Sequence, residues 1–179
     1  NAAGERVLFS QWLTNAFAWD ELIVSWNAVA PHGSGMKVEA RAKIGARPTK
    51  FYSLGLWTED TAERRRESVN DQKDEDGDVL TDILRLTRPV TNLQLQLTLQ
   101  PNDNGEVPSV RRLGLSLVDR AAEPAPRPPF KAAWGKTLAV PERSQLSYEG
   151  GRDWCSATAV SMVLAYWAKQ LKRPALDID

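Results

Sequence analysis

Residues 36–44 alternate apolar and polar side chains without exception, and this pattern limits the possible fold more than any other in the chain. Successive side chains of a β-strand point to opposite faces, so a strict alternation predicts a strand with one buried face. Segments rich in Pro, Asn, Asp and Gly, such as residues 101–105, predict turns between strands. The same reasoning predicts further strands over residues 22–29, 51–57, 79–86, 93–99 and 113–117.

Many short alternating strands with polar turns are typical of an antiparallel β-sandwich. We therefore expect residues 1–120 to form a mainly β domain, a jelly-roll-like sandwich. Four prolines fall within residues 121–129, which predicts an extended spacer, and we assign residues 121–133 to a Pro-rich linker. Residues 134–179 then form a second domain, in which the sequence predicts a loop followed by a helix.

Cys155 is the single cysteine of the chain, and it falls where this helix is expected to begin. The first N–H groups of a helix lack intrahelical partners and the macrodipole is positive there, which favours a thiolate over a thiol. Cys155 is therefore a candidate nucleophile. The alternative interpretation is a small, buried and unreactive side chain of the core.

The residues before the thiol favour the first interpretation. Pro141 precedes a Ser144–Gln145 pair, a Gly-containing loop follows, and Trp154 stands directly before Cys155 at the start of the apolar helix. This arrangement, over residues 138–170, resembles the papain-fold cysteine peptidases of the bacteriocin-processing type, peptidase family thirty-nine.

The resemblance implies a papain-like α+β fold for residues 134–179, with Cys155 as the catalytic nucleophile and Gln145 as an oxyanion-hole donor. One departure is Ala157, which stands where a common form of the family has Pro. Residues 5–120 resemble, more weakly, the β-rich domain that precedes the peptidase in exported bacterial members. From the resemblance we expect export to the cell envelope or beyond, with a signal peptide already removed.

A papain-like peptidase also needs a His as base, oriented by an Asp or Asn, and both follow the Cys in that fold. An ordinary thiol is only a few per cent ionised at neutral pH. No His follows Cys155, and the single histidine, His32, lies in a predicted turn of the first domain, where we expect it to face solvent. We therefore expect residues 134–179 to be an incomplete peptidase domain, and the 179-residue chain alone to be inactive.

The expected helix gives a second reason to look for a missing partner. Residues 154–168 carry no charged side chain, so the helix is apolar around most of its circumference. Residues 134–179 are too few to bury such a helix on all sides. The expected partner is the remainder of the peptidase domain, either a missing segment or a separate chain.

The leading hypothesis is thus a cysteine peptidase that hydrolyses peptide bonds of a peptide or protein substrate through an acyl-enzyme, without a cofactor. The alternative is a non-catalytic cell-envelope or carbohydrate-binding protein with a degenerate peptidase domain. A third possibility keeps the thiol chemistry but acts on other amides or esters, because papain-like folds host several reactions. Sugar stacking would fall on Trp12, Trp19, Trp26 and Trp57, although core packing is the commoner role of such residues.

Charge excludes some other classes. The chain has 23 basic and 23 acidic residues, so no electrostatic case exists for binding nucleic acid, and no apolar run reaches the length of a membrane span. The acidic residues 74–78 suggest calcium, but their spacing fails the EF-hand pattern, and we expect a solvated loop and no metal. Residues 64–66 are three arginines, for which a solvated face is the expected role.

Overall fold

The computed structural model describes residues 4–61, 66–123 and 126–178. The chain divides into two compact units, Asn1–Pro124 and Ala125–Asp179, and each is described by itself. Arg64 and Arg65 of the predicted arginine run lie outside the described residues. The three-part division at residues 120 and 133 stays a prediction.

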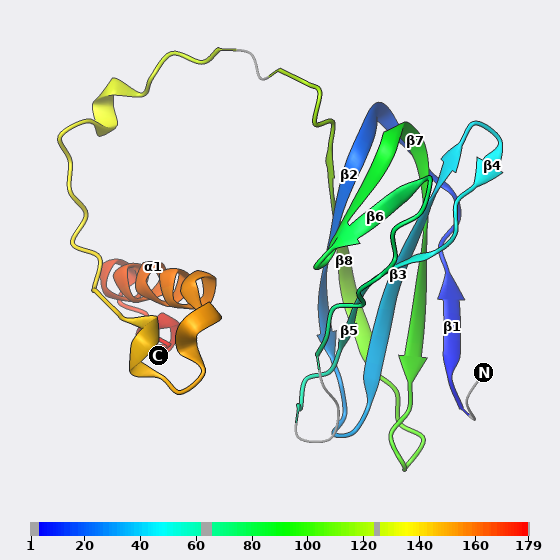
Figure 1. Cartoon of the computed structure of the whole chain (residues 1–179). Helices are drawn as coiled ribbons and strands as arrows, with labels where there is room; N and C mark the ends of the chain where they lie inside the picture. Colours follow the sequence, from blue (N-terminus) through cyan, green and yellow to red (C-terminus); the bar gives the residue numbers. More distant parts are fainter. Residues whose placement is uncertain (1–3, 62–65, 124–125, 179) are drawn as a thin grey trace. The chain divides into compact units, whose positions relative to one another are not determined.

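The first unit is built from antiparallel strands (Figure 1). Five of them follow the order β4-β3-β7-β2-β8, while β1 and β6 also pair with β7, and β5 pairs with β3. The strands are β1 (Arg6–Phe9), β2 (Leu13–Val29), β3 (Gly35–Ile44), β4 (Arg47–Pro48), β5 (Tyr52–Trp57), β6 (Gly77–Leu80), β7 (Ile83–Gln100) and β8 (Ser109–Val118).

Two long strands, β2 and β7, belong to both layers of the unit. The second half of β7 pairs with β3 and β1, whereas its first residues pair with β6 and β2. The register between β2 and β7 shifts on either side of the Trp19↔Val90 pair, so the ladder is irregular there. Arg88 and Pro89 lie in this stretch of β7; proline has no N–H to donate and is tolerated at such irregular positions.

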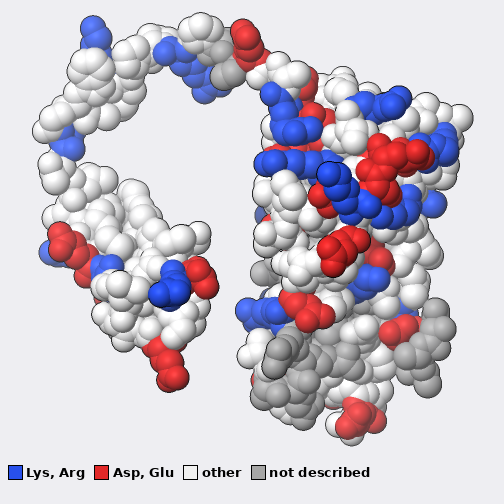
Figure 2. Space-filling view, in the orientation of Figure 1, with Lys and Arg blue, Asp and Glu red and all other residues white. Residues whose placement is uncertain are grey.

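The two layers enclose one hydrophobic core. Alternate residues of β3 and β7 point inward, as the sequence pattern predicted, and β2 contributes Trp19 and Leu22, which are fully buried. Leu113 and Leu117 of β8 close the core from the other layer as partly buried side chains. The predicted β-sandwich is therefore confirmed. Figure 2 shows acidic and basic side chains mixed over the visible face of this unit.

One predicted strand is wrong in extent. Residues 79–86 form the end of β6, a turn and the start of β7, so the segment is a hairpin. The chain reverses at Thr81, whose φ is 63°, in the left-handed region. The turn contains neither Gly nor Pro and is flanked by Leu80 and Ile83, so the apolar pattern conceals it.

The second unit contains one α-helix, α1 (Cys155–Leu171), within residues 126–178. Four 3₁₀ turns surround it: η1 (Lys131–Ala133), η2 (Gln145–Ser147), η3 (Gly151–Asp153) and η4 (Pro174–Leu176). The predicted helix start at Cys155 is confirmed. No described helix is both long and apolar enough to cross a membrane.

Candidate active site

The thiol of Cys155 lies at the first residue of α1 and is exposed. The first hydrogen bond of the helix runs from the N–H of Thr158 to the carbonyl of Trp154, at 2.9 Å. Trp154 stands at the N-cap position and forms no side-chain cap. The backbone donors of the first turn therefore lack an intrahelical acceptor and point toward the end of the helix at which the thiol lies. Cys155 is thus not a buried core side chain in this unit.

Gln145 is held against the segment that leads into the helix. Its Nε2 donates a hydrogen bond of 2.6 Å to the backbone carbonyl of Arg152. Arg152 lies three residues before Cys155. A side-chain amide has two N–H bonds, so one bond to Arg152 leaves a second donor for a ligand. The catalytic roles of Gln145 and Cys155 stay predictions, but the fold brings the two segments together.

Consecutive tight turns shape this loop. The N–H of Tyr148 donates to Gln145 at 3.3 Å, that of Gly151 to Tyr148 at 3.1 Å, and that of Trp154 to Gly151 at 3.0 Å, each to a carbonyl. Gly150 has a φ of 73°, a conformation that glycine adopts without strain. The chain therefore returns on itself between Gln145 and Cys155.

Gly151 allows the closest approach in the loop. A Cβ atom at this position would lie 1.9 Å from the backbone carbonyl oxygen of Gln145 and 3.0 Å from its carbonyl carbon. No side chain fits at such distances, so only glycine permits this packing. The sequence showed a Gly-Gly pair here but gave no sign that Gly151 touches Gln145.

A small cavity of about 230 Å³ lies beside the loop and one face of α1. The rings of Tyr148 and Trp154, 6.0 Å apart, form part of its wall together with Thr158. Arg143 also lines it, and its Nη2 donates to Asp177 Oδ1 at 2.5 Å, which ties the start of the loop to the segment after α1. The cavity is mostly apolar, with one cation at its edge.

Most of the apolar surface of α1 is not packed within the second unit. Ala165 and Ala168 are its only buried residues. One continuous face is about half exposed; its members are Val160, Val163, Trp167 and Leu171. The helix therefore has the composition of a buried element but is covered on one side alone.

The other candidates from the sequence lie in the first unit. His32 is exposed in the turn before β3, and its Nδ1 is hydrogen-bonded to Asp60, as expected for a surface residue. The four tryptophans do not form one sugar-stacking surface, because Trp19 is fully buried and Trp26 and Trp57 pack against the core. Trp12 lies outside that core and is partly exposed.

Two members of the acidic run 74–78, Asp74 and Asp76, are satisfied by protein partners. Asp74 Oδ1 accepts hydrogen bonds from the Tyr52 hydroxyl at 2.5 Å and from two backbone N–H groups, while Lys50 Nζ lies 3.1 Å from its other oxygen. Asp76 is buried and pairs with Arg47 through two bonds of 2.7 and 2.8 Å. Across residues 4–61, 66–123 and 126–178, no group of three or more His, Cys, Asp or Glu side chains could hold a metal ion.

The same contacts shift two pKa values in opposite directions. Burial acts to raise the pKa of Asp74, but the hydrogen bonds from Tyr52 and Lys50 outweigh it and lower that pKa to about 2. Burial and the neighbouring Asp74 carboxylate raise the pKa of Tyr52 well above its ordinary value. The acidic run is thus a structural hydrogen-bond network that ties the charged loop to β5.

The comparisons with known proteins concern the first unit. A family model described as the peptidase C39 N-terminal domain matches residues 6–117. No curated protein and no solved structure matches the chain.

Proposed function

The chain belongs to the peptidase C39 N-terminal domain family, and on this basis we propose that it is the N-terminal part of a cysteine peptidase with Cys155 as its nucleophile. The matched residues are those of the β-sandwich, so the assignment of peptide hydrolysis to the second unit is our inference. One observation carries it: the Gln145 amide is bonded to the carbonyl of Arg152, three residues before the exposed Cys155 at a helix start.

The proposed reaction follows from the groups in this segment. The thiolate of Cys155 attacks the carbonyl carbon of a peptide bond, and the carbonyl oxygen takes up the negative charge. The second N–H of the Gln145 amide and the backbone N–H of Cys155 donate to that oxygen. Collapse of the intermediate breaks the C–N bond, the amine leaves with a proton from the base, and water later hydrolyses the thioester.

The base is a histidine supplied by polypeptide that follows Cys155 in the complete protein. This polypeptide also covers the exposed face of α1 around Val163 and Trp167. An apolar helix face needs a packing partner, and a nucleophilic thiol needs a base. The same additional polypeptide would supply both. The remainder of the peptidase domain is therefore the first partner that we propose.

The test compares the 179-residue chain with the complete gene product, using a library of peptide substrates and an electrophilic thiol probe. We expect the complete protein to hydrolyse peptides and the 179-residue chain to react with the probe at Cys155 without turnover. Cys155→Ser should abolish hydrolysis, and Gln145→Ala should lower kcat by about 10²- to 10³-fold. Gln11→Ala, at an exposed position of the first unit, is the matched control and should leave kcat unchanged. Turnover by the Cys155→Ser variant would contradict the proposal.

A further inference from the structure

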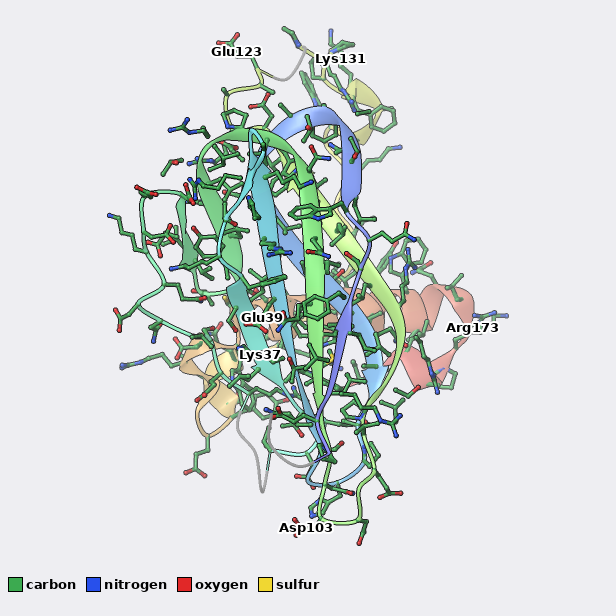
Figure 3. All side chains as sticks on the ribbon, turned by 90° about the vertical axis from the view of Figure 1, so that its right-hand side faces the viewer. Lys37, Glu39, Asp103, Glu123, Lys131 and Arg173 are labelled. Atoms are coloured by element: carbon green, nitrogen blue, oxygen red, sulfur yellow. The ribbon has the colours of Figure 1, made fainter. Side chains whose placement is uncertain are left out.

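The outer face of the β3–β7 layer carries side chains that the proposed peptidase chemistry does not use. Figure 3 looks onto β3, β7 and β1 and labels Lys37 and Glu39 of β3. Inward residues of β3 are apolar, so the charged residues that alternate with them lie on the outer face. On this face we define the aromatic–cation cluster, which consists of Phe9, Trp12, Arg41, Lys43 and Phe51.

The five side chains of the aromatic–cation cluster contact one another although they come from distant parts of the sequence. The Arg41 guanidinium lies 4.5 Å from the ring centroid of Phe51 and 5.2 Å from that of Trp12. The Lys43 ammonium lies 4.3 Å from the Trp12 ring, and the rings of Phe9 and Phe51 are 5.9 Å apart, tilted by 52°. Such contacts hold the cations over aromatic faces.

Arg41 is fixed by a neutral partner. Gln94 Oε1 accepts hydrogen bonds from Arg41 Nε at 2.9 Å and from Nη2 at 2.7 Å, and Gln94 Nε2 donates to the carbonyl of Ser10. A guanidinium has five N–H bonds, so three donors remain beyond the two that Gln94 uses. They include one on each terminal nitrogen, which is the pair that binds a carboxylate in bidentate fashion.

The charge of the cluster is not neutralised by the protein. Neither Arg41 nor Lys43 lies within ion-pair distance of a carboxylate in the described ranges. Neighbouring cations are paired: Lys37 Nζ, on the same strand, lies 2.7 Å from Glu39, and Lys50 Nζ, next to Phe51 in the sequence, lies 3.1 Å from Asp74. The two positive charges of the cluster are therefore available to an external anion.

The rings around these cations are accessible. Phe9 is 58% exposed, and Trp12, Arg41, Lys43 and Phe51 are each partly exposed. Exposed aromatic rings next to oriented polar groups are typical of surfaces that bind a ligand with both an apolar face and a charge. We propose that the aromatic–cation cluster binds a polysaccharide whose sugars carry carboxylates: the C–H face of a sugar packs on Phe9, and the carboxylates bind Arg41 and Lys43, which Trp12 and Phe51 hold in place.

The density of charge decides between this ligand and a nucleic acid. Nucleic-acid binding depends on neutralising many phosphates, typically with six to ten contacts. The cluster offers two unpaired cations, the buried Glu39 carboxylate lies on the same face, and the formal charge of the chain is zero. An acidic polysaccharide can bind with fewer charges from the protein and offers a sugar ring face to the exposed Phe9.

The experiment titrates the 179-residue chain with polygalacturonate and with its methyl ester, which keeps the sugar ring but removes the charge. We expect binding of polygalacturonate, weakened at least about tenfold by esterification, since a charge-assisted hydrogen bond is lost. Lys43→Gln and Phe9→Ala should each weaken it by about fivefold or more. The matched control is Arg112→Gln, an exposed cation of β8, which should change it less than twofold.

The same titration with oligodeoxythymidylate and with vesicles of phosphatidylcholine and phosphatidylglycerol separates the proposal from its competitors. Tighter binding of either one than of polygalacturonate would overturn the assignment. So would equal binding of the methyl ester, an unchanged affinity in Lys43→Gln and Phe9→Ala, or no binding of polygalacturonate. Circular dichroism of each variant should match that of the parent chain, since Phe9 is an exposed side chain.

Discussion

Replacing Gly151 by Ala tests whether the loop positions Gln145 for the reaction. The added Cβ would lie 1.9 Å from the carbonyl oxygen of Gln145, whereas real Cβ contacts essentially never fall below 3.0 Å. The two backbone segments must therefore separate by at least about 1.1 Å. A displacement of this size moves the Gln145 amide away from Arg152 and from the place where an oxyanion would form.

The magnitude follows from the sensitivity of catalysis to position. A misplacement of about 1 Å can lower a rate by about 10²-fold, or about 2.7 kcal/mol of transition-state stabilisation. We expect this loss in kcat/KM of the complete protein for Gly151→Ala. The rate at which a small electrophile alkylates Cys155 should change far less, because the thiol stays exposed at the helix start.

A double-mutant cycle shows whether the loss passes through Gln145. If Gly151 acts by positioning that amide, the Gly151→Ala, Gln145→Ala double variant should be no slower than Gln145→Ala alone. Gly150→Asn is the matched control, because nothing lies within 4 Å of its Cβ position and Asn tolerates a φ of 73°. The reasoning is refuted if Gly151→Ala keeps kcat/KM within threefold of the parent, or if the two losses add.

Three further outcomes follow from burial and charge. The pKa of Asp74 falls from an ordinary 3.8 to about 2, so its contribution to stability is complete above about pH 4 and is lost as the pH falls toward 2. Urea unfolding should therefore show about 2 kcal/mol less stability at pH 2 than at pH 5 from this group, and Asp74→Asn should remove that difference. Leu84→Ala, at a fully buried position, should lower the unfolding free energy by about 2–5 kcal/mol. Leu80→Ala, at an exposed position in the same hairpin, should lower it by less than about 1 kcal/mol. Equal losses in the two variants would contradict the assigned core. Trp167→Gln should change the unfolding free energy of the 179-residue chain by no more than about 0.5 kcal/mol, but should lower that of the complete protein by at least about 2 kcal/mol. Chemical denaturation measures both values. An equal effect in the two proteins would show that nothing further packs on α1.

The sequence predicted those parts of the fold that follow from local periodicity. The strict alternation of residues 36–44 predicted β3 and its buried face, and the helix that was expected to begin at Cys155, in a segment without charged residues, is α1. Thr81 was missed because a left-handed turn residue other than Gly or Asn has no signature in the sequence. The length of β2 and β7 was also missed, since their irregular stretch interrupts the period on which the prediction depends.

The candidate site was predictable as a set of residues but not as a geometry. Cys155 and Gln145 could be named from their order and from the family resemblance, whereas the contact between Gly151 and Gln145 depends on loop coordinates that no pattern encodes. The aromatic–cation cluster was missed for a similar reason. The register of β1, β7 and β3 brings Phe9 close to Arg41, and Phe51 reaches them because it directly precedes β5, which pairs with β3.

The continuity of β2 and β7 has a consequence for how the sandwich opens. Each strand is hydrogen-bonded in both layers, so the layers cannot separate without breaking backbone hydrogen bonds of β2 or β7. We therefore expect the two layers of the first unit to unfold together in one cooperative transition.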